Sequence, residues 1–131
     1  MNLVIDSSVW IAHFRNQASP AVQYLRTQAA FEDVAVGDLI LLEVLQGART
    51  DDHARRIRVE LNAFPVLSLL NENLAVAAAQ RYRALRAQGV TVRKSNDLLI
   101  ASYCLEHSCT LLHQDRDFAP FVRHFGLRVA V

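Results

Sequence analysis

The sequence predicts an α/β protein in which short parallel strands form a central sheet with helices on both faces. Short runs rich in Val, Leu and Ile recur along the chain, and segments with helical patterning separate them. Apolar residues make up 52% of the 131 residues, which is enough for a substantial core. The length suits one domain spanning residues 1–131.

Five segments are expected to be strands, because each is a short run of β-branched and aliphatic residues. The first run stops at Asp6, the third begins at Pro65, and the fourth is followed within three residues by Asp115. The five expected strands are residues 3–5, 34–36, 65–67, 110–112 and 127–131.

The segments between these strands carry helix start and stop signals. Ser7 or Ser8 is expected to cap the first helix, and Pro20 fits the first turn of the second. Asn71 is expected to start a long helix that Gly89 closes. The other expected helices cover residues 20–30, 37–47, 51–62 and 96–107, with a short helix or turn over residues 117–122.

Charge and cysteine content narrow the classes of function. The 14 basic and 13 acidic residues nearly cancel, so the net charge neither supports nor excludes a nucleic-acid partner. Cys104 and Cys109 are not expected to make a zinc site. The first ten residues lack the regions of a signal peptide, and no apolar stretch approaches a membrane span. A cytoplasmic location is therefore expected.

Four acidic residues are expected to gather at one edge of the sheet. Asp6 and Asp115 follow parallel strands, whose carboxyl ends meet at the same edge. Asp97 lies in the first turn of a helix, and Glu43 lies in a strongly apolar helix. Each alone has an ordinary alternative, as a helix cap, a turn residue or a solvent-facing side chain. The four together favour a shared site.

Carboxylates that converge would repel one another, and their pKa values would rise unless a cation lay between them. Carboxylates with water prefer Mg²⁺ or Mn²⁺ to zinc, and nucleases use this arrangement. The residues thus indicate a metal-dependent enzyme acting on phosphate esters, with a non-enzymatic Mg²⁺-binding module as the alternative. A receiver-like module would need a lysine on a late strand, but the only lysine, Lys94, precedes a helix.

Four motifs make the chain resemble a PIN-domain ribonuclease, specifically a VapC-type toxin of a bacterial type II toxin–antitoxin pair. They are "VIDSSVWI" at the start, "LLEVLQGAR" around Glu43, "TVRKSNDLLIA" around Asp97 and "LLHQDRDF" around Asp115. They occur in the order and spacing of the family and span nearly the whole chain. Any one of the motifs is weak evidence, whereas the four together are highly specific.

The resemblance implies a three-layer α/β/α fold with a central parallel sheet of about five strands. It also implies Mg²⁺- or Mn²⁺-dependent cleavage of RNA, with transfer RNA or ribosomal RNA loops as the expected targets. Carried over by residue, Asp6, Glu43, Asp97 and Asp115 match the acidic quartet that holds the metal. Asp117 matches a further acid whose involvement in the family is less regular.

The resemblance also implies partners. The first is a cognate VapB-type antitoxin, whose C-terminal segment wraps the toxin and blocks the acidic site. The second is another copy of the chain, as a homodimer within the toxin–antitoxin complex. No membrane partner is expected. The alternatives are a nuclease acting on DNA, a phosphatase, and a catalytically silent module that still binds the antitoxin.

Five further residues are candidates for contacts with the substrate. Ser7 stands where the family often has Thr and keeps the hydroxyl, and His113 stands where the family often has Ser or Thr. Arg93, Lys94 and Arg116 lie beside the acids in sequence and are candidates for binding phosphate. The alternatives are solvated surface charges for the three basic residues and a neutral spacer for His113, for which a metal-ligand role is disfavoured.

Overall fold

A computed structural model describes residues 2–131 of the protein. Four parallel strands form the sheet in the order β3–β2–β1–β4, with β1 pairing on one edge with β2 and on the other with β4. The predicted α/β class with a parallel sheet is therefore confirmed. The strands are β1 (Leu3–Ile5), β2 (Val34–Gly37), β3 (Val66–Leu67) and β4 (Thr110–Leu112).

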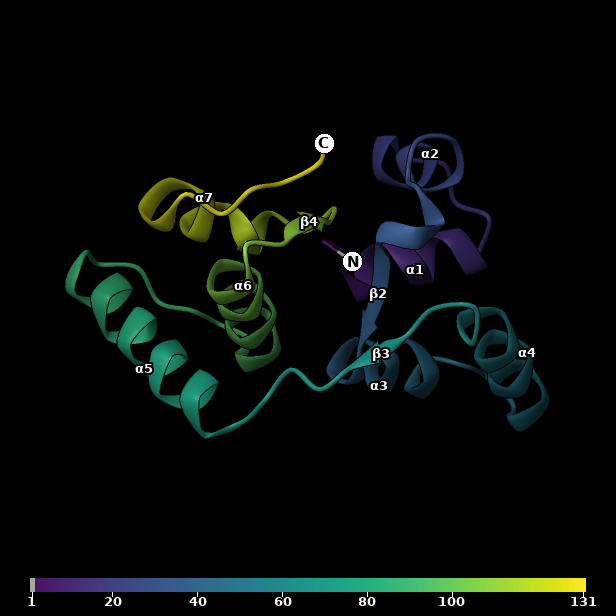
Figure 1. The fold of residues 1–131 in the computed structure, drawn as a ribbon, viewed down its shortest axis with the longest axis horizontal. Coiled ribbons are helices and arrows are strands. Elements are labelled where there is room, and N and C mark those ends of the chain that lie inside the picture. Colours follow the sequence, from purple (N-terminus) through teal and green to yellow (C-terminus); the bar gives the residue numbers. More distant parts are fainter. Residues whose placement is uncertain (1) are drawn as a thin grey trace.

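Two groups of helices lie on opposite sides of the strands. Figure 1 shows α5, α6 and α7 on one side and α1, α2 and α4 on the other, and α5 packs along α6. Among residues 2–131, no helix combines the length and apolar character needed to cross a membrane. The helices are α1 (Ser7–Phe14), α2 (Pro20–Thr27), α3 (Asp38–Gln46), α4 (Asp51–Leu61), α5 (Glu72–Ala87), α6 (Ser95–His107) and α7 (Ala119–Phe125), with 3₁₀ helices at Phe31–Asp33 and Arg116–Phe118.

The core is built on the central strands. Every residue of β1 and β2 is buried, and Ile5, Leu111 and Leu112 are completely inaccessible to solvent. This follows from the sequence, because a parallel sheet covered on both faces requires nearly continuous apolar strands. The close packing of these strands holds the residues that follow them in fixed positions.

The expected fifth strand is reduced to one bridge. Leu111 of β4 pairs in parallel with Val129, and the Leu111 N–H donates to Arg128 O at 2.9 Å. The physical reason is that β4 has only 3 residues. The backbone N–H and C=O groups of successive residues in a parallel strand point alternately toward its two neighbours. Thr110 and Leu112 bond to the β1 side, which leaves only Leu111 for the outer neighbour.

Two helices differ from their expected bounds by more than one residue, and the cap of a third is a different residue. The second helix ends at Thr27 rather than near residue 30, and a 3₁₀ helix follows it. The short helix near the C-terminus divides into a 3₁₀ helix and α7. The cap of α1 is Asp6, rather than Ser7 or Ser8, because its side chain accepts a hydrogen bond from the Ser8 N–H. This last difference concerns the site, since Asp6 is one of the candidate acids.

Candidate active site

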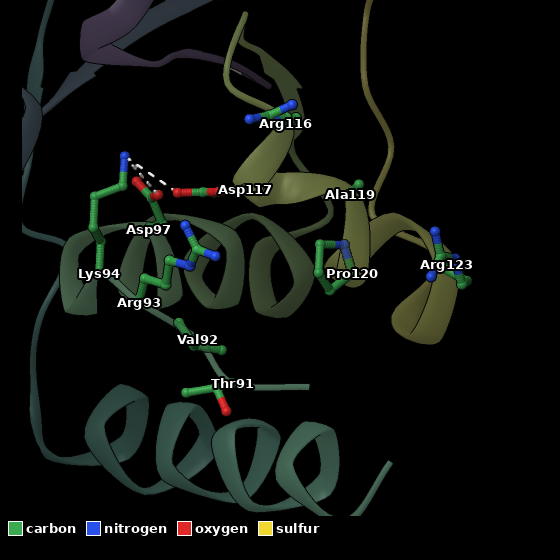
Figure 2. Close-up of a pocket in the computed structure, with 10 residues that line it drawn as sticks. All are labelled: Thr91, Val92, Arg93, Lys94, Asp97, Arg116, Asp117, Ala119, Pro120 and Arg123. Atoms are coloured by element: carbon green, nitrogen blue, oxygen red, sulfur yellow. Dashed lines mark ion pairs between the residues drawn. The ribbon is translucent and has the colours of Figure 1, made fainter. Parts of the chain in front are cut away.

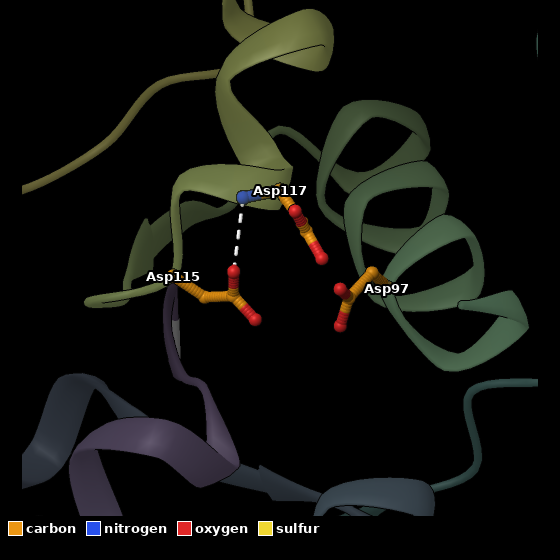
Figure 3. Close-up of side chains that lie close together, drawn as sticks. All are labelled: Asp97, Asp115 and Asp117. Carbon is orange, nitrogen blue, oxygen red and sulfur yellow. Dashed lines mark hydrogen bonds between the residues drawn. The ribbon is translucent and has the colours of Figure 1, made fainter. Parts of the chain in front are cut away.

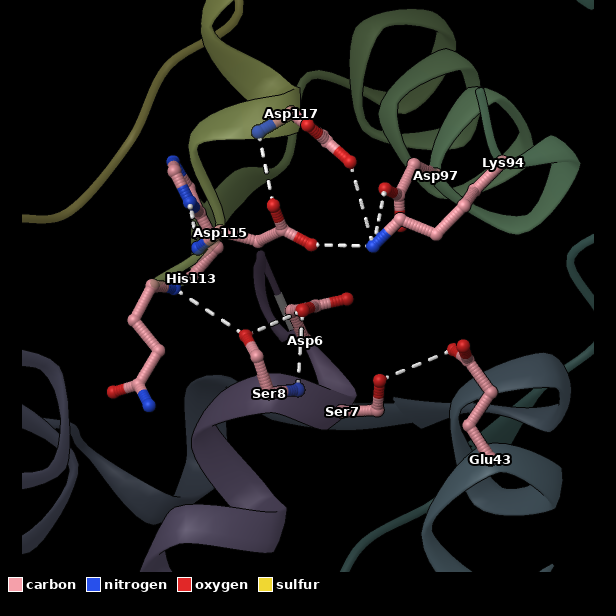
Figure 4. Close-up of polar contacts among 10 residues, drawn as sticks. Asp6, Ser7, Ser8, Glu43, Lys94, Asp97, His113, Asp115 and Asp117 are labelled. Carbon is pink, nitrogen blue, oxygen red and sulfur yellow. Dashed lines mark hydrogen bonds and ion pairs between the residues drawn. The ribbon is translucent and has the colours of Figure 1, made fainter. Parts of the chain in front are cut away.

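The acidic residues meet at the carboxyl end of the sheet, as Figure 4 shows. Asp6 directly follows β1, and its N–H donates to Leu112 O at 2.9 Å, which ties the end of β1 to the end of β4. Asp115 lies three residues after Leu112, while Asp97 projects from the first turn of α6. Asp6 and Asp97 are buried, and Asp115 is partly buried.

Three of these carboxylates form the tightest group. Asp97, Asp115 and Asp117 each offer an oxygen, and these oxygens all lie within 4.8 Å of one another. Figure 3 shows Asp97 facing the other two across the gap between α6 and the 3₁₀ helix. The Asp117 N–H donates to Asp115 Oδ1 at 2.9 Å and so fixes their relative position. The group thus includes Asp117, the acid whose role the family resemblance left least certain, and does not include Asp6 or Glu43.

Lys94 lies in the middle of this group. Its Nζ is 2.7 Å from Asp115 Oδ2, 3.4 Å from Asp97 Oδ2 and 3.5 Å from Asp117 Oδ2. The hydrogen bond to Asp115 is the largest cause of a raised Lys94 pKa, although burial acts in the opposite direction. The ammonium group therefore stays charged and partly neutralises the three carboxylates.

Asp6 acts as a helix cap through only one of its two oxygens. Its Oδ2 accepts hydrogen bonds from the Ser8 N–H at 3.1 Å and from Ser8 Oγ at 2.5 Å. The other oxygen, Oδ1, is buried and has no partner among residues 2–131. Burial raises the pKa of the Asp6 carboxyl, and the nearby Asp115 charge raises it further, against the two Ser8 bonds. The free oxygen leaves Asp6 able to bind a cation as well as cap α1.

The pKa of Asp97 is raised well above the usual value for an aspartate. Its side chain is 8% exposed, and within residues 2–131 its buried Oδ2 has only the Lys94 ammonium, at 3.4 Å, as a partner. Burial raises the pKa of Asp97 to about 6, with Lys94 lowering it and the charges of Asp6 and Asp115 raising it. A carboxyl in such surroundings is suited to bind a cation or accept a proton near neutral pH.

Glu43 is connected to the site by a hydrogen bond from Ser7. Ser7 Oγ donates to Glu43 Oε1 at 3.2 Å, which joins α3 to the start of α1. Glu43 is partly buried, as its apolar neighbours in sequence suggested. Ser7, the candidate substrate contact, is 8% exposed and is used in this bond. Ser7 therefore orients Glu43 beside Asp6.

His113 holds the loop that carries Asp115. Its Nδ1 accepts the Asp115 N–H at 3.1 Å, so this nitrogen carries no proton. Burial lowers the pKa of His113, against the pull of the Asp6 and Asp115 charges. Its ring packs against the buried Phe118, with ring centroids 4.9 Å apart. Burial would raise the pKa of Asp115, but hydrogen bonds from Lys94 and the Asp117 N–H outweigh it and hold that pKa low.

A basic cleft of about 410 Å³ opens beside the carboxylates (Figure 2). The candidate phosphate-binding residues Arg93, Lys94 and Arg116 all line it, together with Asp97 and Asp117. The cleft therefore connects the acidic group to three of the five candidate substrate contacts.

Three residues of the site were not among the sequence candidates. Ser8 Oγ accepts the Gln114 N–H at 3.3 Å while donating to Asp6, so it links the ends of β1 and β4. Arg123, on α7, lines the basic cleft. The adjacent hydroxyls of "DSS" were a signal for Ser8, whereas Gln114 and Arg123 had no distinguishing pattern in the sequence.

A parallel α/β sheet that carries converging carboxylates beside a basic cleft defines a class of protein suited to acting on phosphodiesters. The chain belongs to the PIN domain family, whose model matches residues 3–122. The family suggested by the four motifs is thereby confirmed.

Curated and structural relatives agree with this membership. The chain is 34% identical over 130 residues to "Ribonuclease VapC11" of Mycobacterium tuberculosis, which covers 98% of this chain and 97% of that protein. In fold it is similar to VapBC2 from Rickettsia felis, with a TM-score of 0.78, 15% identity, and 99% and 98% of the two chains covered. It is also similar to FitAcB from Neisseria gonorrhoeae, with a TM-score of 0.76, 21% identity, and 98% and 96% covered.

Proposed function

We propose that this protein is a metal-dependent endoribonuclease toxin that cleaves structured RNA and is neutralised by a VapB-type antitoxin. The observation that carries the proposal is the group of Asp97, Asp115 and Asp117 on a PIN-domain fold, with Asp6 and Glu43 beside it. The relative VapC11, which matches over nearly its whole length, is named a ribonuclease. Transfer RNA and ribosomal RNA loops are the proposed substrates.

The donor set fits a hard divalent cation, which we propose to be Mg²⁺ or Mn²⁺. All its groups are carboxylates, and within residues 2–131 the buried Asp6 Oδ1 has no hydrogen-bond partner, while the buried Asp97 Oδ2 has only the Lys94 ammonium at 3.4 Å. A buried carboxylate oxygen without a partner is costly, and a bound cation would satisfy Asp6 Oδ1. The residues proposed to hold it are Asp6, Glu43, Asp97, Asp115 and Asp117. Such a cation supplies a Lewis acid for the scissile phosphate and lowers the pKa of bound water.

The side chains of the site have separate roles in the proposed reaction. Asp97 or Glu43 orients the attacking water and accepts its proton. Ser7 keeps Glu43 in place, and His113 keeps Asp115 in place, through the hydrogen bonds described above. Because water is the nucleophile in this proposal, the ribose 2′-hydroxyl is not consumed. Preference for RNA then comes from contacts to exposed bases and from the shape of the loop.

The proposed partners follow from the relatives. The name VapBC2 pairs a VapC with a VapB, and we propose that a VapB-type antitoxin blocks the acidic site of this chain in the cytoplasm. A basic side chain of the antitoxin could pair with the carboxylates as Lys94 does. A homodimer within that complex is part of the same proposal.

The test is cleavage of total transfer RNA and of ribosomal RNA by antitoxin-free protein. We expect discrete fragments with Mg²⁺ or Mn²⁺, none with EDTA, and restoration when metal is returned in excess. Single-stranded DNA and a simple phosphate ester, assayed in parallel, distinguish a DNA nuclease and a phosphatase. A folded, metal-binding protein that cleaves none of these substrates would favour the silent antitoxin-binding module.

Substitution of Lys94 is expected to strengthen metal binding. The ammonium nitrogen lies within 3.5 Å of the same oxygens that the cation would use, and like charges at such distances repel. We expect Lys94→Met to bind Mg²⁺ about tenfold more tightly, as measured by calorimetry. Lys94→Arg keeps the charge and serves as the matched control, with an affinity near that of the wild type. Equal Mg²⁺ affinities in Lys94→Met and wild type would contradict the prediction that the Lys94 ammonium group and the cation compete for the same carboxylate oxygens.

A further inference from the structure

The basic cleft extends away from the carboxylates along α7. Its wall on one side is the segment from Thr91 to Lys94, and on the other it is Ala119, Pro120 and Arg123. Figure 2 shows Arg93 beside the carboxylates and Arg123 at the far end of the cleft. The cleft therefore leads from the proposed site of cleavage to a position on α7.

The charge of this cleft is not balanced by the protein. Arg93, Arg116 and Arg123 are exposed, and within residues 2–131 none of them forms an ion pair or a side-chain hydrogen bond. The two acids that line the cleft, Asp97 and Asp117, face Lys94 instead. Three guanidinium groups are thus left free, and guanidinium groups bind phosphate oxygens in pairs of parallel hydrogen bonds.

The arrangement fits a strand better than a single anion. The three arginines come from three separate elements, namely the segment before α6, the 3₁₀ helix 116–118 and α7. Between them, Val92, Ala119 and Pro120 give the wall an apolar part that can contact a base or ribose. Proteins that bind single-stranded nucleic acid combine a positively charged groove with surfaces, usually aromatic, that contact the bases; in this cleft the base-contacting surface is aliphatic.

We propose that this cleft binds the single-stranded RNA on one side of the cleaved phosphodiester. Arg93, Arg116 and Arg123 each bind a backbone phosphate, and the apolar wall of Val92 and Pro120 contacts a base. The proposal rests on the ribonuclease function proposed above. It adds Arg123 to the substrate contacts and assigns a direction along which the strand leaves the carboxylates.

The test measures RNA binding without cleavage. A short fluorescent single-stranded RNA is titrated with the whole chain in EDTA, and its anisotropy gives the affinity at several salt concentrations. The variant replaces Arg93, Arg116 and Arg123 with Gln. The control replaces Arg56, Arg58 and Arg83, three exposed arginines on α4 and α5, and so removes the same charge elsewhere. Urea unfolding verifies that both variants fold.

We expect the cleft variant to bind RNA about tenfold more weakly, or worse, at low salt. The slope of log affinity against log salt should become shallower by about 2, since each lost phosphate contact to a single strand contributes about 0.7. The control variant should keep the slope of the wild type within experimental error.

Two outcomes would overturn the proposal. One is an equal loss of affinity and slope in the cleft and control variants, which would reduce the cleft to general surface charge. The other is displacement of the RNA by an oligoglutamate of equal charge at equal concentration, which would make the cleft a site for anionic peptides. Either result leaves metal-dependent cleavage by the wild type intact. Absence of cleavage by the wild type would instead reject the proposed function itself.

Discussion

The variant Asp97→Asn is expected to lose RNA cleavage by about 10²- to 10⁴-fold, the range for removal of a positioned acid–base group. Asn has nearly the same shape as Asp but no charge, so the change removes a buried ligand and proton acceptor without opening a cavity. Asp97 is buried, and its carboxylate lies within 4.8 Å of those of Asp115 and Asp117. The measurement is single-turnover cleavage of transfer RNA in saturating Mg²⁺.

The same substitution is expected to stabilise the protein in EDTA. Burial raises the Asp97 pKa from 3.8 to about 6, so the folded state holds the proton more tightly than the unfolded state. Wild-type stability therefore falls as the pH rises from about 4 to about 6, and Asp97→Asn lacks this loss. At pH 7.5 we expect the variant to be more stable by about 1–3 kcal/mol, because each pKa unit corresponds to about 1.4 kcal/mol.

Urea unfolding at pH 4 and pH 7.5 tests the expected change in the free energy of unfolding. The advantage of Asp97→Asn should be large at pH 7.5 and small at pH 4, where the folded carboxyl is protonated and the unfolded carboxyl is nearly half protonated. Asp51→Asn is the control, because Asp51 is an exposed acid in the first turn of α4. A variant that cleaves RNA at the wild-type rate would remove Asp97 from the site, whatever its stability.

The alternation of short apolar runs and helical segments was sufficient to predict the fold class. It placed β1, β2, β3 and β4 within a residue of their observed bounds. The fifth strand was predicted too long, because the apolar pattern of residues 127–131 does not reveal how few outward-facing groups β4 offers. Whether a segment favours the strand conformation follows from its own residues, whereas the length over which it pairs depends on the backbone groups that the neighbouring strand offers.

For the site, the sequence could identify residue types but not which oxygens remain free. Asp6 was open to two interpretations, as a cap and as a cation ligand, and the structure shows a capping bond on Oδ2, with no partner for Oδ1 among residues 2–131. The position of Lys94 among three acids was not predictable, because Asp115 lies 21 residues further along the chain. Asp117 joins the group only because a 3₁₀ helix turns it back toward Asp97.

Phe118 is expected to be the residue on which this turn depends, and Phe118→Ala is expected to cost about 3–5 kcal/mol of stability. The side chain is completely buried and lies against the His113 ring, while its N–H donates to Asp115 O at 3.2 Å. Truncation leaves a cavity directly beneath the loop that carries Asp115 and Asp117. We therefore expect weaker Mg²⁺ binding as well as a lower urea midpoint.

Two controls separate these effects. Phe31 is 68% exposed, so Phe31→Ala should change the stability by no more than about 0.5 kcal/mol and leave metal binding unchanged. Phe118→Leu keeps most of the apolar volume and should lose less stability than Phe118→Ala. If Phe118→Ala were to bind Mg²⁺ with wild-type affinity at a temperature where it is folded, the Phe118 side chain would support only the core. Weakened binding in the folded variant would instead mean that an apolar contact sets the spacing of the acids, since Phe118 itself offers no ligand.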